Sequence, residues 1–199
     1  MKELEMGKNV NISEEKFEEI LNKIYSVLKT LNFRKESCNF RKFEEDGLCK
    51  VINLQKNKWN TSNGLEFVIN IGIYFTEDKK LINPKFKEYE CMIRKRIENK
   101  GQWWEIDEET EVEAMFKDIE KHLNEILEWF NHFESKEATI QMILNGEADQ
   151  YSDTEVFYYQ TAKMLANMGY VETVYNRIKD IWSTTFMELA NEIYENKKR

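Results

Sequence analysis

Histidine, cysteine and proline are scarce in this sequence, and their scarcity excludes several kinds of site. There are two histidines and three cysteines among the 199 residues. The odd number of cysteines, without Cys-x-x-Cys spacing, argues against a disulfide framework and against a zinc site. His122 and His132 lie ten residues apart, which is not the i, i+4 spacing of a helical metal site. The cysteines are therefore expected as small core residues.

Long apolar segments are also missing. The longest apolar stretch, Leu65–Phe75, has 11 residues and is interrupted by Glu66 and Asn70, whereas a membrane helix needs about 20. The first ten residues are charged and lack the apolar segment of a signal peptide. The sequence therefore predicts a cytoplasmic protein without a membrane segment.

Catalytic signatures are the third absence. The sequence has no glycine-rich phosphate loop, no Gly-x-Ser-x-Gly and no His-Glu-x-x-His. The acidic run from Glu105 to Glu113 resembles a hard-metal site, but acidic residues are also expected where a helix begins, because the helix dipole favours them there. We therefore predict no catalytic residues, no metal site and no cofactor.

The charge is negative and unevenly distributed. The formal net charge is −8, with seven basic and four acidic residues in 34–60 but three basic and sixteen acidic residues in 105–160. A negative chain is on average repelled by nucleic acid and by anionic membranes. Nucleic acid is therefore an unlikely partner, although the basic region 34–60 leaves a polarity that a protein partner could use.

Hydrophobic periodicity predicts a helix followed by strands. Apolar residues recur at helical spacing from Phe17 to Leu31, and Asn11 is a favourable N-cap. The period then changes to two, and Asp46-Gly47 indicates the turn of a hairpin. The expected strands are Cys38–Phe43, Leu48–Gln55, Leu65–Phe75, Tyr89–Ile97 and Gln102–Ile106, with a loop over 76–86 that contains the single proline, Pro84.

The remainder of the chain reads as helical. Capping signals and apolar stripes predict helices over 110–133, 135–146, 152–169 and about 174–193. The fold class is therefore α+β, with an antiparallel four- or five-stranded sheet, helices packed on one face, and a C-terminal helical hairpin. We expect residues 1–146 to form the α+β domain and 147–199 the hairpin, packed on the same core. The large apolar side chains of the last two helices are expected in that core, and they are Phe157, Met164, Met168, Trp182 and Phe186.

Strand alternation collects polar side chains on one face of the expected sheet. Arg94 and Arg96 share a face, and two guanidinium groups beside amides could bind a carboxylate or a phosphate. The alternative is an ordinary solvent-facing side of an antiparallel sheet. An acid beside each arginine would indicate a structural role. The candidate ligand- or partner-binding residues are Arg41, Asn53, Gln55, Lys58, Trp59, Asn70, Arg94, Arg96 and Trp103.

Several strings in this region resemble a known family. They are Phe40-Arg41, the segments Val51–Asn60, Phe67–Tyr74 and Cys91–Ile97, and Trp103-Trp104. Together they resemble a bacterial family catalogued as domain of unknown function 4304, over roughly residues 15–133. The resemblance implies an α+β fold and brings no activity with it.

Three functions remain open at this point. The leading hypothesis is a non-enzymatic binding protein that engages a protein partner through the polar sheet face or the helical hairpin. An immunity protein that neutralises a basic toxin would be one form of it. The alternative is an enzyme acting on a small phosphorylated or carboxylate ligand at the arginine and amide face. Nucleic-acid binding is weaker because of the net charge, and it would use Arg41, Lys50, Lys56, Lys58 and Trp59.

Overall fold

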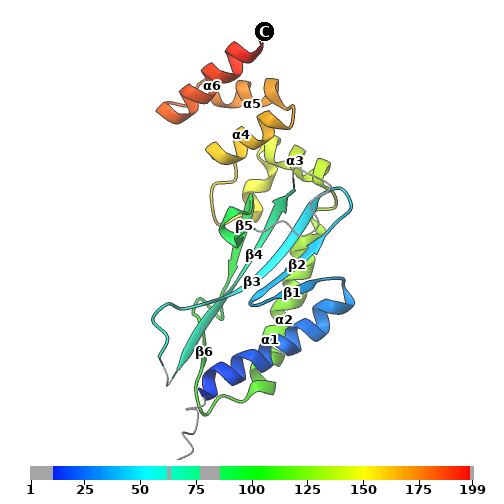
Figure 1. The fold of residues 1–199 in the computed structure, drawn as a ribbon, viewed down its shortest axis with the longest axis vertical. Helices are drawn as coiled ribbons and strands as arrows, with labels where there is room; N and C mark the ends of the chain where they lie inside the picture. Colours follow the sequence, from blue (N-terminus) through cyan, green and yellow to red (C-terminus); the bar gives the residue numbers. More distant parts are fainter. Residues whose placement is uncertain (1–10, 62–63, 77–85, 198–199) are drawn as a thin grey trace, which may run out of the picture. The chain divides into compact units, whose positions relative to one another are not determined.

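The computed structural model describes residues 11–61, 64–76 and 86–197. It shows an α+β protein with an antiparallel sheet and C-terminal helices (Figure 1), as predicted. The helices are α1 (Ile12–Thr30), α2 (Val112–Asn131), α3 (Lys136–Asn145), α4 (Tyr159–Asn167), α5 (Val171–Ile178) and α6 (Thr184–Lys197), with 3-10 turns at η1 (Glu88–Glu90) and η2 (Glu147–Tyr151). The strands are β1 (Arg34–Glu36), β2 (Asn39–Phe43), β3 (Leu48–Lys56), β4 (Leu65–Phe75), β5 (Ile93–Ile97) and β6 (Trp104–Ile106).

The sheet has six strands in the order β1-β2-β3-β4-β5, and β6 also pairs with β4. The short strand β1, which pairs with β2, was not predicted from the sequence. One edge of β4 pairs with β3. The strands β5 and β6 therefore share the other edge of β4. Residues 98–103 between them loop out as a small hairpin, in which Asn99 and Gln102 exchange backbone hydrogen bonds. Positive φ angles of 52° at Lys100 and 80° at Gly101 are typical of its two-residue turn.

The chain forms two compact units. Unit 1 comprises Met1–Lys42, Ile52–Asn70 and Arg96–Leu127, and unit 2 comprises Phe43–Val51, Ile71–Lys95 and Glu128–Arg199. Strands β3, β4 and β5 and helix α2 therefore continue from one unit into the other. The domain boundary expected between residues 146 and 147 stays a prediction.

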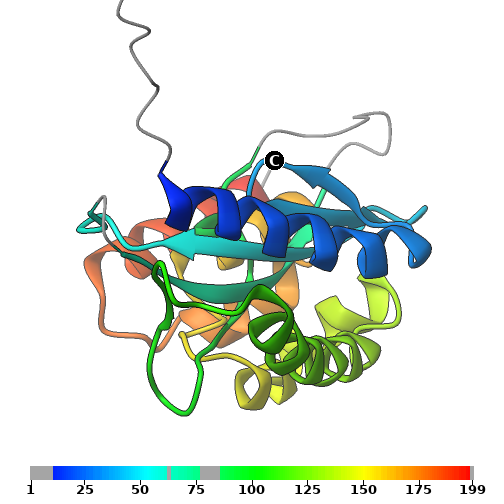
Figure 2. The same cartoon turned by 90° about the horizontal axis from the view of Figure 1, so that it is seen from below.

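The core of unit 1 forms where the apolar stripe of α1 meets the sheet. The Asn11 side chain accepts a hydrogen bond from the Glu14 N–H, as expected of an N-cap. Phe17 of α1 contacts Phe67 of β4 edge-on at 5.3 Å between ring centroids, and Phe67 stacks on Trp104 of β6 at 5.6 Å. Figure 2 shows α1, in blue, alongside the strands. The predicted stripe is buried except for its last member, since Leu31 is the C-cap and is 38% exposed; the buried members are Phe17, Ile20, Leu21, Ile24 and Leu28.

Unit 2 has a second apolar cluster on the strands. Tyr74 of β4 stacks on Phe86 at 3.9 Å between ring centroids. The cluster consists of Cys49, Val51, Phe86 and Cys91, with Phe43 and Tyr74 packed against it.

Helix α3 of unit 2 begins after the Ser135 N-cap and ends at the Gly146 C-cap, which has a φ of 81°, as the sequence predicts.

The C-terminal segment differs from the predicted hairpin, because it contains three short helices. The prediction that a helix begins at Ser152 is wrong, since α4 begins at Tyr159. The Ser152 hydroxyl instead bonds the backbone of Arg94, 58 residues away. Trp182 was expected in the core and is 99% exposed, whereas Phe157 and Met164 are buried.

The sequence also predicted a loop around Pro84 and the absence of a membrane helix. Most of the expected loop around Pro84 lies in 77–85, outside the described residues. Among the helices of the described residues, none combines the length and apolar character needed to cross a lipid bilayer.

Candidate functional site

Three strands of unit 1 bring polar side chains together in a connected row. The Asn70 amide on β4 donates to Gln55 Oε1 on β3 at 2.8 Å, and Arg96 Nε on β5 donates to Asn70 Oδ1 at 3.2 Å. The Arg96 guanidinium lies 5.9 Å from the centroid of the Trp103 ring, within the range of a cation–π contact. We call Gln55, Asn70, Arg96 and Trp103 the Arg96 row. Gln55, Asn70 and Arg96 were predicted to share a face with Trp103 at its rim, and the structure places the four residues in contact.

Asn70 is the buried member of this row, with 4% of its surface exposed. A buried amide is costly unless both ends are hydrogen-bonded, and Gln55 and Arg96 satisfy its two ends. The Gln55 oxygen, both ends of the Asn70 amide and the Arg96 Nε are therefore engaged with one another, which stabilises the sheet and leaves fewer polar groups for a small ligand.

The other predicted strand residues have partners outside the row. Asn53 donates to the side chain of Asn39 on β2 at 2.9 Å. Arg41 is 8% exposed and forms an ion pair with Glu36 of β1. Asn39 was missed by the sequence analysis, although its alternation with Arg41 along β2 would have indicated the shared face.

Arg94 belongs to unit 2 and has a structural contact of its own. Its guanidinium donates to the Tyr89 carbonyl at 3.1 Å, and its backbone carbonyl accepts from the Ser152 hydroxyl and the Asp153 N–H. Arg94 and Arg96 thus each donate to a neutral oxygen, that of the Tyr89 carbonyl and that of the Asn70 amide, and their predicted role as an anion-binding pair stays a prediction.

Residues 57–61 after β3, which we call the Trp59 loop, are held in shape by Glu66. The Asn57 N–H donates to the Glu66 carbonyl at 2.8 Å, and the Asn57 amide donates to its carboxylate at 2.6 Å. The Asn60 side chain accepts from the Glu66 N–H at 2.8 Å and donates to its carbonyl at 3.1 Å. These contacts order the backbone on both sides of Trp59.

The loop presents a tryptophan to solvent. Trp59 is 76% exposed, and Lys58 Nζ lies 4.9 Å from the centroid of its ring. A large aromatic side chain at an exposed position adds little to folding, but it is a frequent energetic centre of protein interfaces. Lys58 and Trp59 were predicted from the sequence. Glu66, which anchors the loop, was not, because a single anchoring acid leaves no periodic pattern.

Among the described residues, four titratable groups have pKa values that depart clearly from their ordinary ones, and all four move away from neutrality. Hydrogen bonds from Thr110 and Tyr170 lower the pKa values of Asp107 and Glu137, and a hydrogen bond to Glu113 raises that of Lys23. A hydrogen bond to Glu137 raises the pKa of Tyr170 to about 12. General acids and bases are usually tuned in the opposite direction, toward the working pH.

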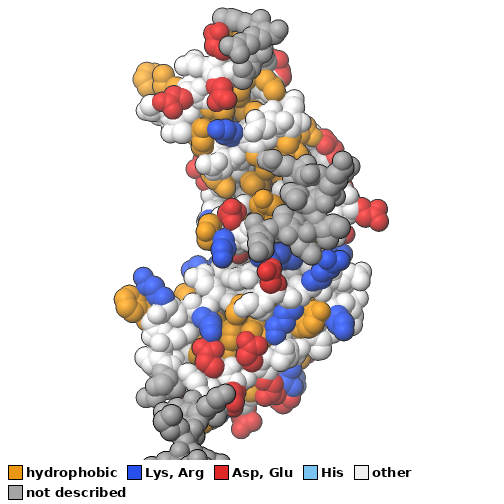
Figure 3. Space-filling view, in the orientation of Figure 1, with side chains coloured by type: hydrophobic (Ala, Val, Ile, Leu, Met, Phe, Trp, Pro, Cys, Tyr) orange, Lys and Arg blue, Asp and Glu red, His pale blue; other side chains and the backbone are white. Residues whose placement is uncertain are grey.

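Metal and nucleic-acid sites find little support on the described surface. Across residues 11–61, 64–76 and 86–197, no group of three or more His, Cys, Asp or Glu side chains is placed to hold a metal ion. On the face seen in Figure 3, Lys and Arg side chains are interspersed with acidic, hydrophobic and uncharged ones. A nucleic-acid surface would be expected to form a continuous basic stripe.

The fold and this surface define an α+β protein with exposed aromatic and cationic side chains on an antiparallel sheet and its loops. The family model described as domain of unknown function 4304 (DUF4304) matches residues 24–132, more than half of the chain, and the chain belongs to that family. The Arg96 row and the Trp59 loop lie inside this stretch, and α3 to α6 lie outside it. No curated protein and no solved structure shows a significant match to the chain.

Proposed function

We propose that this chain is a non-enzymatic binding protein that engages a protein partner through the Trp59 loop. The observation that carries the proposal is the 76% exposure of Trp59 on a backbone fixed by Asn57, Asn60 and Glu66. A preordered loop loses little conformational entropy on binding, so more of the contact energy remains for affinity. Tryptophan is among the residues most enriched at the energetic centres of interfaces.

The enzyme alternative is less well supported by the same surface. Small-molecule sites need convergent polar groups with free hydrogen-bonding capacity, whereas Gln55, Asn70 and Arg96 bond one another. The pKa shifts of Lys23, Asp107, Glu137 and Tyr170, all directed away from neutrality, lend no support to an acid–base mechanism at these groups. A binding role in the cytoplasm, for example neutralisation of a basic toxin by this acidic chain, fits the net charge of −8.

The test is capture of partners from the native host with the full chain and with Trp59→Ala. We expect the variant to lose at least about tenfold in affinity for the captured partner, equivalent to about 1.4 kcal/mol, because an interface centre is removed. Its melting temperature should stay close to that of the wild type because the indole is exposed.

Tyr89→Ala is the matched control, since this aromatic residue is 65% exposed and uses its backbone carbonyl for its contact with Arg94. Equal retention of the partner by wild type and Trp59→Ala would refute the proposal. Equal losses in Trp59→Ala and Tyr89→Ala would also refute it, because they would indicate nonspecific aromatic contacts.

A further inference from the structure

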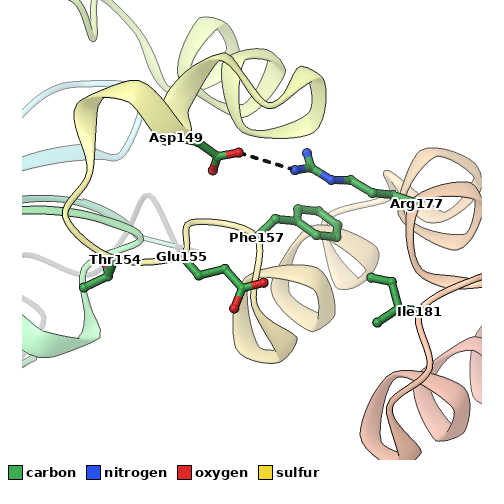
Figure 4. Close-up of a pocket in the computed structure, with 6 residues that line it drawn as sticks. All are labelled: Asp149, Thr154, Glu155, Phe157, Arg177 and Ile181. Carbon is green, nitrogen blue, oxygen red and sulfur yellow. Dashed lines mark ion pairs between the residues drawn. The ribbon is translucent and has the colours of Figure 1, made fainter.

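Unit 2 contains a pocket of about 250 Å³ between η2, the segment that precedes α4, and the end of α5. Figure 4 shows its side chains, which come from three separate stretches of the chain. Phe157 and Ile181 provide apolar walls, and Glu155 and Asp149 provide carboxylates. The residues that line the pocket are Asp149, Thr154, Glu155, Phe157, Arg177 and Ile181.

Arg177 is the only cation among these lining residues, and its charge is already balanced. It donates to the Ile143 carbonyl and, at 2.9 Å, to the Leu144 carbonyl at the end of α3, where the helix dipole is negative. Its second terminal nitrogen lies 3.9 Å from Asp149 Oδ2, and its guanidinium lies 4.0 Å from the centroid of the Phe157 ring. Arg177 therefore fixes one wall, and it leaves no excess positive charge for an anion.

Glu155 is the carboxylate that remains uncompensated. It makes no hydrogen bond or ion pair with any of the described residues, and in Figure 4 its carboxylate points away from the Asp149–Arg177 pair. The sequence from 137 to 162 contains five acidic residues and no Lys or Arg, with Lys136 and Lys163 at its two ends, and two of the five acids line the pocket. A cation entering the pocket would be stabilised, and an anion would be repelled.

An exposed aromatic side chain stands next to this pocket along the chain. Trp182 directly follows Ile181, and it is 99% exposed. The turn that carries it is held by hydrogen bonds from the Ile181 N–H to the Ile178 carbonyl and from the Ser183 N–H to the Ile181 carbonyl. Tryptophan is enriched among the residues that contribute most to protein interfaces.

We propose that this pocket receives a lysine or arginine side chain from a basic segment of a protein partner. The charge of that side chain pairs with Glu155, its aliphatic stem packs against Phe157 and Ile181, and Trp182 covers the neighbouring part of the segment. The occupant is assigned by charge complementarity, because Asp149 and two helix carbonyls balance the charge of Arg177, whereas the carboxylate of Glu155 has no cationic partner among the described residues. The site lies in unit 2 and does not depend on the Trp59 loop, so either proposal can fail alone.

The test is titration of the full chain with an acetylated, amidated hexaarginine peptide at 0.1 M salt. Binding is measured by calorimetry and by the change in tryptophan fluorescence. We expect saturable binding that weakens at least fivefold in Glu155→Gln. Glu188→Gln is the matched control, because it removes the same charge from an exposed position of α6. It should stay within twofold of the wild type. The fluorescence change should be largely lost in Trp182→Phe.

Three results would overturn the inference. The first is the absence of saturable binding to the wild type. The second is equal weakening in Glu155→Gln and Glu188→Gln, which would mean that the peptide responds to overall charge. The third is loss of binding in Trp59→Ala but not in Glu155→Gln, which would assign the peptide to the Trp59 loop instead.

Discussion

At the scale of single residues, the arginines of this protein illustrate how neighbours decide the role of a side chain. Arg41 is nearly buried beside Glu36, Arg96 bonds the Asn70 amide, and Arg177 bonds the last carbonyls of α3. The guanidinium is the same in each case, but its acceptor is a carboxylate, an amide or a helix end. Arginine in a sequence therefore indicates a site only when its acceptors are known.

The hydrogen bond from the Tyr170 hydroxyl to the Glu137 carboxylate should make stability depend on pH. It raises the pKa of Tyr170 to about 12 and lowers that of Glu137 below its ordinary value of 4.5. Tyr170→Phe should lower the free energy of unfolding at pH 7 by about 1 kcal/mol or less, because the pair is close to the surface. Urea unfolding between pH 3 and pH 11 measures this difference.

The sign of the pH dependence follows from each shift. The contribution of Tyr170 is complete below the pKa of an unfolded tyrosine, about 10, and is lost as the pH rises toward about 12. That of Glu137 is complete above its unfolded pKa and is lost as the pH falls through its lowered folded pKa. The difference between wild type and Tyr170→Phe should therefore shrink at both extremes. A difference that stays constant with pH, or one that Tyr89→Phe reproduces, would contradict this prediction.

At the scale of elements, β4 accommodates the segment before β5 by omitting a side chain. A Cβ at Gly72 would lie 2.7 Å from Cys91 Cβ and 2.8 Å from Cys91 Sγ. Cys91 is 1% exposed, so it has little space to move. The glycine is therefore required for close packing between β4 and this segment.

Gly72→Ala should reduce the free energy of unfolding by about 1–3 kcal/mol, the usual cost of overpacking. Cys91→Gly in the same chain removes the opposing atoms, so the double variant should be less destabilised than the sum of the single variants. Gly64→Ala is the control, since its new Cβ would meet only the Ile106 carbonyl, at 3.8 Å. Thermal melts that are unchanged in Gly72→Ala, or simple additivity in the double variant, would show that the packing is looser than the distances indicate.

The same elements show which features could be predicted from the sequence. The contact of Gln55, Asn70 and Arg96 follows from alternation along strands, which is a local property. The break between α5 and α6 could not be found in this way, because residues 179–183 contain neither glycine nor proline and the apolar spacing continues through them. Ser152 and Glu155 form a capping signal in sequence, but a tertiary contact with Arg94 takes the hydroxyl.

At the scale of the whole molecule, the family match and the compact units have different boundaries. The match ends at residue 132, whereas unit 2 combines 43–51 and 71–95 with everything from residue 128 onward. Within unit 2, Trp129 Nε1 donates to the Tyr151 carbonyl at 3.0 Å, and the Asp153 N–H donates to the Arg94 carbonyl at 2.8 Å. The segment beyond Gly146 therefore contributes to the core of unit 2 and covers the backbone of β5.

A shortened chain of residues 1–146 should consequently fail to fold as a stable unit. Removal of residues 147–199 uncovers Trp129, Phe133 and Met92, which are at most 8% exposed in the full chain. Each large apolar side chain returned to water costs about 1.5–3 kcal/mol. The total approaches the 5–15 kcal/mol that stabilises a typical domain, and the uncovered backbone at Arg94 favours association between strand edges. We expect no cooperative thermal transition by circular dichroism and aggregation in size-exclusion chromatography, with the full chain as the control. A monomeric 1–146 chain that melts cooperatively near the temperature of the full protein would instead show that residues 147–199 are a separable appendage.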